Sequence, residues 1–294
     1  MSVWILSKDD DTTYENGRLI ESFDVKGITS KLVDPNDFDV VINQHSNTIL
    51  YKGEPITDLP KALLVRYGAG ISKFMLSLIR QFQNAGVTVI NTADSIEISK
   101  DKLEASQILS KHKIPIPKTM MVRFPVNDKI VEKEIGFPCV VKLITGSYGD
   151  GVHLCEKRKD FVKLMDFVEN LGSSKTMLVQ EYLGERPGED LRVLVIGGKV
   201  IGAMRRTAPE GDFRANISSG GTGQSFELTD EIEFIALETV RALDLTIAGV
   251  DLLFDKDGFK VCEANSNPGF LGFETYCGID VANLITDYVK FLMH

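Results

Sequence analysis

The chain has 294 residues, with 33 lysine and arginine residues against 42 aspartate and glutamate residues, giving a net charge of −9. This length and a hydrophobic content of 43% predict more than one packed lobe, and they exclude collagen-like, disordered and disulfide-scaffold classes. The acidic balance argues against a protein that mainly grips nucleic-acid phosphates. No run approaches the ~20 apolar residues of a membrane helix and no signal peptide is recognisable, so the sequence predicts a soluble cytoplasmic protein.

The first part of the chain alternates short β-type runs with helical patterns. The expected strands are Val3–Leu6, Val40–Asn43, Ala62–Arg66 and Val87–Asn91, and the expected helix is Ile71–Asn84. Because Gly86 ends this helix just before a strand, Ala62–Asn91 predicts a βαβ unit with a parallel sheet. We therefore expect an α/β domain over residues 1–95.

The pattern after residue 95 changes to hairpins. Helices are expected at Lys100–His112, Asp160–Leu171, Thr229–Leu243 and Val281–Leu292. Strands are expected at Cys139–Leu143, Val152–Glu156, Met177–Leu183, Leu191–Ile196 and Val200–Arg206. Two prolines in Ile114–Pro117 force extended backbone and mark a hinge candidate. The pattern predicts a central α+β lobe over residues 96–181 and a C-terminal lobe over residues 182–294.

The most informative stretch is the predicted hairpin Gly249–Asn265. A three-residue loop centred on Asp257 predicts that Asp251 and Glu263, each six positions away, face one another. Asn265, two residues beyond Glu263, shares that face. Opposed carboxylates repel unless a positive group lies between them, and carboxylate and amide oxygens suit Mg²⁺. The sequence therefore predicts a magnesium site, with a solvated acidic hairpin face as the alternative.

A glycine-rich loop follows the strand that carries Lys142. Gly146, Ser147, Gly149 and Gly151 lie in this loop. Backbone amides of such a loop approach phosphate oxygens closely. A mid-strand lysine is costly to bury unless it meets an anion. We expect a phosphate-binding loop, and the alternative is a flexible hairpin tip.

Two further features allow a functional or a structural interpretation. Lys102, at the start of a predicted helix, could reach the same anion or could be a surface lysine. Met177–Leu183 could be an edge strand whose free backbone groups pair with an adenine rim, or an ordinary strand.

The strands around the Gly197–Gly198 turn carry charged residues. Counting from the turn predicts that Asp190 faces Arg205 and that Arg192 faces Ala203. An Asp190–Arg205 ion pair is thus the structural alternative to a functional role for either residue.

Three arginines are candidates for holding oxyanions. Arg206 and Arg214 cluster with Asn216, and guanidinium groups suit planar carboxylate and phosphate oxygens. Arg66 ends a strand of the predicted parallel sheet, where ligands of such sheets gather. It is expected either to hold a substrate carboxylate or to be an exposed strand-end residue.

The order of these motifs resembles the ATP-grasp superfamily and, within it, the RimK family of carboxylate–amine ligases. The pieces that carry the resemblance are Lys142 with Gly146–Gly151, Gln180–Tyr182, Asp190–Arg192, Glu210–Asn216, Glu263–Phe270 and Gly278–Ala282. It implies an ATP-grasp fold, α/β followed by α+β, in which an N-terminal parallel-sheet pre-ATP-grasp domain precedes two α+β lobes that clamp ATP. The segment between Tyr14 and Asp39 is shorter than in bacterial members.

The resemblance implies a nucleotide site with contacts to phosphate, adenine and ribose. The residues implied at the phosphates are Lys102, Lys142, Arg214 and the loop residues Gly146, Ser147, Gly149 and Gly151. Those implied at the adenine are Gln180, Glu181, Tyr182 and Leu183, and Asp190 helps to hold the ribose end.

The resemblance also implies a metal and substrate site. Asp251, Glu263 and Asn265 would hold two Mg²⁺ ions, with Glu263 bridging and Mn²⁺ as an alternative ion. The implied catalytic residues are Arg206, Arg214 and Asn216, of which Arg206 and Asn216 face the reacting carboxylate while Arg66 binds substrate.

Members of this family glutamylate ribosomal protein tails, extend archaeal cofactors or make small glutamate conjugates in animals. The implied reaction is attack of a carboxylate on the γ-phosphate of ATP, giving an acylphosphate that the amine of glutamate converts to an amide. The implied partners are a small-molecule or peptide carboxylate and an amino acid. A kinase acting on a hydroxyl and a non-catalytic ATP-binding protein are the alternatives. The oligomeric state, with a homodimer or homotetramer as options, does not follow from the sequence.

Overall fold

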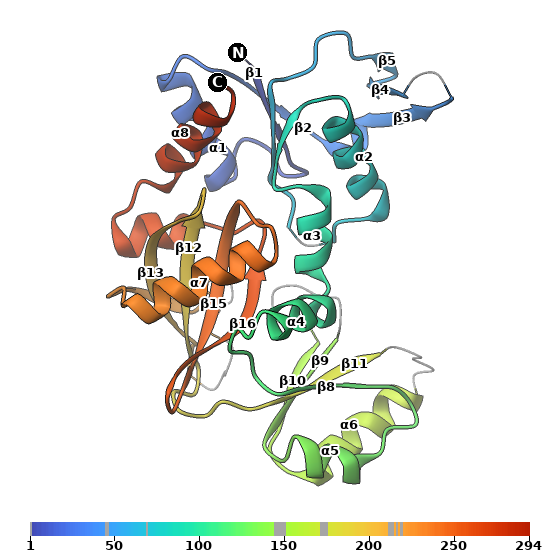
Figure 1. Ribbon diagram of the computed structural model, residues 1–294, viewed down its shortest axis with the longest axis vertical. Coiled ribbons are helices and arrows are strands. Elements are labelled where there is room, and N and C mark those ends of the chain that lie inside the picture. Colours follow the sequence, from blue (N-terminus) through green and yellow to red (C-terminus); the bar gives the residue numbers. More distant parts are fainter. Residues whose placement is uncertain are drawn as a thin grey trace.

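The computed structural model describes residues 2–44, 47–68, 70–143, 151–170, 176–210, 215, 217 and 220–294. In Figure 1 the N-terminal part lies at the top, and helices α3 (Ala93–Lys100) and α4 (Lys102–Lys111) lead down to a central lobe at the bottom. The last third of the chain then returns to lie between these two parts. The third segment of the sequence is therefore placed where it can share a cavity with both of the others.

The N-terminal part is built on a parallel sheet, as predicted. Its strands β1 (Ser2–Leu6), β2 (Thr29–Val33), β6 (Ala62–Val65) and β7 (Thr88–Ile90) lie in the order β2-β1-β6-β7. The predicted strand Val40–Asn43 is not part of this sheet. That segment belongs to a separate antiparallel sheet of β3 (Phe38–Ile42), β4 (Asn47–Tyr51) and β5 (Glu54–Pro55), which follows the short 3-10 helix η1 (Pro35–Asp37).

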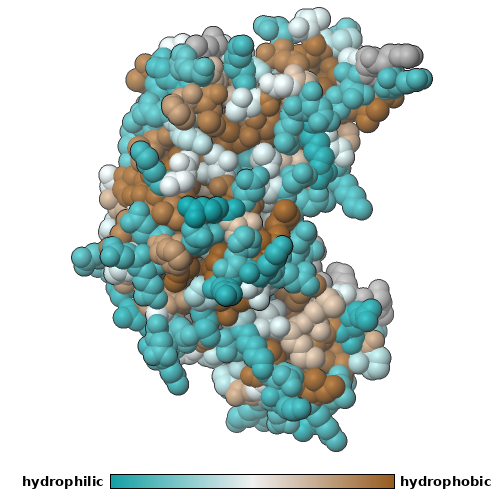
Figure 2. Space-filling model, viewed as in Figure 1, coloured by the Kyte–Doolittle hydropathy of each residue, from teal (hydrophilic) through white to brown (hydrophobic). Residues whose placement is uncertain are grey.

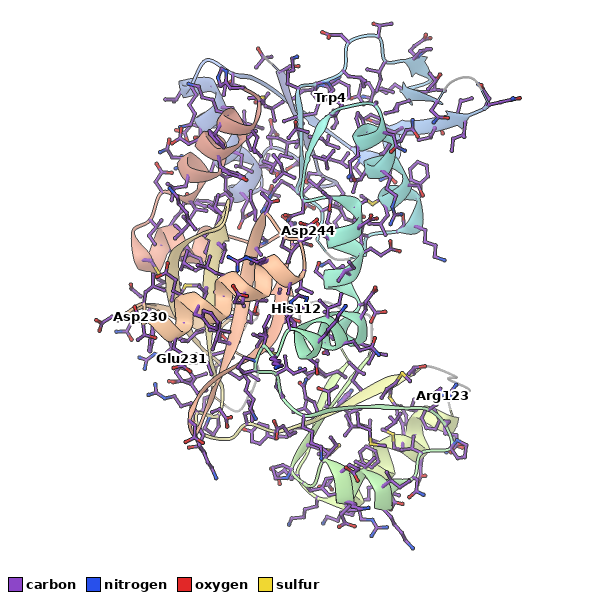
Figure 3. All side chains as sticks on the ribbon, viewed as in Figure 1. Trp4, His112, Arg123, Asp230, Glu231 and Asp244 are labelled. Atoms are coloured by element: carbon purple, nitrogen blue, oxygen red, sulfur yellow. The ribbon has the colours of Figure 1, made fainter. Side chains whose placement is uncertain are left out.

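Aromatic packing joins these two sheets. Trp4 of β1, labelled in Figure 3, lies with its ring centroid 6.1 Å from Phe38, 5.9 Å from Tyr51 and 6.1 Å from Phe82. Large aromatic surfaces buried together stabilise such a contact beyond their area alone.

Helices α1 (Tyr14–Val25) and α2 (Lys73–Asn84) connect the parallel strands. The Ser72 side chain caps α2 by accepting a hydrogen bond from the Met75 amide at 3.3 Å. Met75, Leu78, Ile79 and Phe82 recur at helical spacing and are buried against the sheet. The cap and the apolar stripe explain why this helix was predictable.

The central lobe is a four-stranded sheet covered by two helices. Its strands are β8 (Thr119–Val122), β9 (Cys139–Leu143), β10 (Val152–Cys155) and β11 (Met177–Glu181), in the order β10-β9-β11-β8, and its helices are α5 (Asp128–Glu134) and α6 (Arg158–Asn170). The pairs described within it are antiparallel. Strand β11 therefore lies inside the sheet, and of the two interpretations of Met177–Leu183 the edge strand is wrong.

The C-terminal lobe contains a five-stranded antiparallel sheet in the order β14-β13-β12-β15-β16. The strands are β12 (Glu189–Ile196), β13 (Lys199–Thr207), β14 (Thr222–Phe226), β15 (Ile247–Asp255) and β16 (Gly258–Asn265). Helix α7 (Asp230–Ala242), whose first residues Asp230 and Glu231 are labelled in Figure 3, packs on this sheet. A short π-helix, η3 (Phe273–Cys277), precedes the last helix, α8 (Val281–Leu292).

Helix α8 does not stay with its own lobe but packs beside α1 (Figure 1). The buried hydroxyls of Ser22 and Thr286 share a hydrogen bond of 2.6 Å between these two helices. The N-terminal part and the C-terminal lobe are thus joined by both apolar and polar contacts. The domain boundaries at residues 95 and 181 remain our proposal. Within the described part of the chain, no helix is both long and apolar enough to span a membrane.

Candidate active site

A cavity of about 540 Å³ lies where the three parts of the chain meet. Figure 2 shows the outline of the molecule indented between the N-terminal part and the central lobe. The predicted site residues that line the cavity are Arg66, Lys102, Lys142, Gln180, Glu181, Tyr182, Leu183, Asp190, Arg206, Asp251, Glu263 and Asn265. Residues from each of the three parts of the chain thus converge on a single cavity.

The two acids on the late hairpin lie opposite each other, as predicted. Asp251 of β15 pairs with Glu263 of β16. The turn, however, consists of Lys256 and Asp257 instead of the predicted three-residue loop. A bulge at Cys262 adds one residue to β16 and restores the pairing. The correct register therefore arises from two deviations that cancel.

The Asp251 carboxylate is held by two arginines. Arg192 donates from Nε to Oδ1 at 2.7 Å and from its terminal nitrogen to Oδ2 at 2.6 Å. Arg206 donates to the same Oδ2 at 2.8 Å. Burial raises the pKa of Asp251, but attraction to these guanidinium groups outweighs it and holds the pKa below its usual value. Guanidinium groups thus supply positive charge beside Asp251, one of the two opposed acids.

Arg206 lies one register position away from the prediction. A bulge between Leu194 and Val195 shifts the strands, so Asp190 faces Arg206 rather than Arg205. Both Asp190 oxygens accept hydrogen bonds of 2.6 Å from Arg206. The same shift places Arg192 opposite Met204 instead of Ala203. Since the Arg206 side chain is only 4% exposed, it forms a fixed wall of the cavity.

Lys142 faces the cavity from β9 and is buried, with 9% of its surface exposed. Its ammonium donates to Gln180 Oε1 at 2.6 Å and lies 3.6 Å from Cys262 Sγ. The Gln180 amide in turn donates to Thr119 Oγ1 at 2.9 Å. The acceptor at this contact, Gln180 Oε1, is a neutral amide oxygen and not a carboxylate, so it does not neutralise the lysine charge. The Lys142 ammonium is therefore well placed to bind an anion in the cavity.

The side chain of Glu181 connects the central lobe to the C-terminal lobe. Its Oε1 atom accepts hydrogen bonds from the Lys118 amide at 2.8 Å and from the Lys260 ammonium at 2.7 Å. The backbone of β11 pairs with strands on both sides, and Tyr182 and Leu183, just beyond its end, line the cavity.

Arg66 lies at the carboxyl end of β6, as predicted, but it is buried, with 8% exposed. Two of its nitrogens lie 3.2 Å from the Pro268 carbonyl oxygen, to which they donate. Its guanidinium carbon also lies 5.6 Å from the centroid of the Phe270 ring. The exposed strand-end alternative is therefore wrong.

Several lining residues were missed by the sequence reasoning. Ser7 follows β1 at the same sheet edge as Arg66, a signal that could have identified it. Asn16 donates to Ser7 Oγ at 3.2 Å and so fixes the loop after β1. Lys100 lines the cavity beside Lys102, and burial lowers the pKa of Lys100. Arg192 was noticed in the sequence but given no role in the site.

Some predicted residues cannot be placed. Gly146, Ser147, Gly149, Arg214 and Asn216 lie outside the described residues. Gly151 is described and precedes β10 with a φ of +73°, a conformation that favours glycine.

The metal prediction rests on two carboxylates and one amide. Among the residues that the structure describes, no cluster of three or more His, Cys, Asp or Glu side chains could hold a metal ion. The oxygen donors of Asp251, Glu263 and Asn265 nevertheless line one wall together, and hard oxygen ligands of this kind fit Mg²⁺. Asn265 Oδ1 accepts a hydrogen bond of 3.0 Å from the Asn267 amide, which orients this donor.

A parallel-sheet domain followed by two antiparallel lobes that enclose such a cavity defines an ATP-grasp fold. Comparison with solved structures confirms the ATP-grasp fold. The ATP-grasp ligase PsnB, in a complex with a phosphomimetic precursor variant, Mg and ADP, has a TM-score of 0.75 at 21% identity and covers 100% of this chain and 98% of its own. D-alanine–D-alanine ligase from Bacillus anthracis has a TM-score of 0.69 at 16% identity, with 100% and 97% covered.

Family comparisons are more specific. The chain matches the RimK PreATP-grasp domain over residues 1–96 and the RimK-like ATP-grasp domain over residues 99–289. It is 38% identical over 291 residues to a probable alpha-L-glutamate ligase of Xanthomonas euvesicatoria pv. vesicatoria, covering 99% of this chain and 97% of that protein. A protein of the same description from Methanococcoides burtonii is 37% identical over 278 residues, with 94% and 91% covered. The chain belongs to the RimK-like ATP-grasp family and is an ATP-dependent ligase.

Proposed function

We propose that this ligase joins L-glutamate to the carboxylate of a protein tail, peptide or small-molecule acid. The observation that carries the proposal is the placement of Asp251 opposite Glu263, in a cavity that Lys142 and Arg66 also line. This arrangement provides cationic groups for a triphosphate and a carboxylate, together with oxygen ligands for the metal that accompanies ATP. Glutamate as the amine is supported by the names of the relatives.

The nucleotide would lie between the central and C-terminal lobes. Lys102 and Lys142 would contact its phosphates, and Tyr182 and Leu183 would line the adenine just beyond β11. Asp190 would help to hold the ribose end. The PsnB complex with ADP and Mg supports nucleotide binding in this fold.

Asp251, Glu263 and Asn265 would hold Mg²⁺, as two ions, or Mn²⁺ in its place. The ions would neutralise the triphosphate so that an anionic carboxylate can approach it. The arginine neighbours of Asp251 favour the ionised form of its carboxylate. The ionised form is the one that binds a metal.

Arginine residues that line the cavity would serve both steps of the reaction. Arg66 would bind the acid and orient a carboxylate oxygen toward the γ-phosphorus, which releases ADP and forms an acylphosphate. The glutamate amine would attack the acyl carbon, forming the amide and releasing phosphate. Arg206 would place its fixed positive charge near the developing oxyanion, together with Arg214 and Asn216.

A cytoplasmic location stays a prediction.

The test is a screen for glutamate-dependent ADP release. Purified protein is supplied with ATP, Mg²⁺, L-glutamate and one small acid or peptide at a time, and the products are weighed by mass spectrometry. The proposal expects ADP release that requires both the acid and glutamate and a product heavier by one or more glutamyl residues. A phosphorylated product formed without any amine would indicate a kinase, and ATP binding without turnover would indicate a non-catalytic protein.

A further inference from the structure

Arg192 is the strongest unassigned group in the cavity. It lies on β12 directly opposite Asp251 of β15, with 13% of its side chain exposed. Its guanidinium engages both oxygens of that carboxylate, at 2.7 Å and 2.6 Å. A bidentate contact of this kind fixes the orientation of the carboxylate as well as its charge.

Gly249 provides the room for this contact. A Cβ atom at this position would lie 3.3 Å from both Cδ and Nε of Arg192 and 3.1 Å from the Pro268 side chain. These contacts are tighter than ordinary packing, so the arginine lies close against the β15 backbone. Arg192 and Asp251 therefore pair across two adjacent strands, and the arginine side chain is held against the sheet.

The hydrogen bonds to Asp251 use the oxygens that a cation would need. Oδ1 accepts from Arg192, and Oδ2 accepts from both Arg192 and Arg206. A divalent cation at this carboxylate must displace at least one of these donors or lie close to a like charge, and both alternatives weaken its binding.

We propose that Arg192 is a positioning residue that holds Asp251 and competes with the divalent cation for it. The protein then binds a free cation weakly, and the metal enters together with the nucleotide, whose phosphates supply further oxygen ligands and negative charge. This inference rests on the proposed function, because it takes Asp251 as a metal ligand.

The experiment measures Mn²⁺ binding to the full-length protein without nucleotide, by the electron paramagnetic resonance signal of free Mn²⁺. Arg192→Met should bind Mn²⁺ about tenfold more tightly than the wild type, since a charge-assisted hydrogen-bond pair no longer competes. The matched control is Arg205→Met, because Arg205 lies on the neighbouring strand and donates to Gln224 at 2.6 Å; it should retain the wild-type affinity.

A second variant covers the case in which Arg192→Met fails to fold. Arg192→Lys keeps the charge but loses the bidentate geometry, and it should bind Mn²⁺ about threefold more tightly than the wild type. Unchanged or weaker binding by the folded variants would overturn the inference. Asp251→Asn separates the metal assignment from the proposed competition. If Asp251→Asn leaves the Mn²⁺ affinity unchanged, the assignment of Asp251 as a metal ligand is wrong. If it abolishes Mn²⁺ binding while Arg192→Met has no effect, only the competition between Arg192 and the cation is wrong.

Discussion

Asn91 anchors the hairpin of the paired acids to the N-terminal sheet, and its replacement tests that coupling. The residue follows β7 and is 2% exposed. Its amide donates to the carbonyl oxygens of Ile247 and Ser266, both at 2.7 Å. Its Oδ1 atom accepts from the amides of Thr246 at 2.6 Å and Ile247 at 3.0 Å. A single side chain thus satisfies backbone groups at the start of β15 and just after β16.

Asn91→Ala should lower the free energy of unfolding by about 4 kcal/mol, because four hydrogen bonds at roughly 1 kcal/mol each are lost from a buried position. Urea-induced unfolding followed by circular dichroism measures this loss. Asn84→Ala is the matched control, since Asn84 is exposed at the end of α2, and it should change stability by less than about 0.5 kcal/mol. A loss below about 1 kcal/mol for Asn91→Ala would refute the coupling.

Three further predictions concern catalysis and pH. Glu263→Gln should abolish turnover while calorimetry still detects ATP binding, because it removes one negative charge from the proposed metal ligands Asp251, Glu263 and Asn265. Unchanged turnover would contradict the metal assignment. Lys142→Met should raise KM for ATP at least about tenfold with little loss of folding, since a charged donor to phosphate is removed; an unchanged KM would contradict the phosphate role. Burial raises the pKa of Glu274, but hydrogen bonds from Tyr14 and Arg18 outweigh it and hold the pKa below the usual 4.5. The stabilisation by this carboxylate should therefore be complete above pH 4.5 and disappear as pH falls through its native-state pKa. Urea unfolding of the wild type and Glu274→Gln should accordingly show a stability difference that shrinks on acidification, and a constant difference would refute the role of the charge.

Local patterns were sufficient where apolar spacing is strong. The unit from β6 to β7 was predicted because α2 carries a continuous apolar stripe between two buried runs. The last helix was predicted with its observed bounds, Val281–Leu292, since its buried residues also recur at helical spacing. By contrast, α1 contains Gly17 and several charged residues, and β2 includes Lys31, so neither showed a clear period.

The site was harder to predict than the fold, because its contacts depend on strand order and bulges. Asp251 and Arg192 are 59 positions apart, and no local pattern shows that their strands are neighbours. The bulge at Ile201 moved Asp190 from Arg205 to Arg206, although the turn residues were recognised correctly. Convergence of the carboxylates was nevertheless predictable, since a hairpin relates both residues through its own turn.

The most direct test of the ligase assignment follows one oxygen atom. The acid identified by glutamate-dependent turnover is labelled with ¹⁸O in its carboxylate, and the released phosphate is analysed by mass spectrometry. Transfer through an acylphosphate predicts one labelled oxygen in each phosphate. Phosphate that carries no label while the amide still forms would contradict activation of the carboxylate by ATP in this cavity.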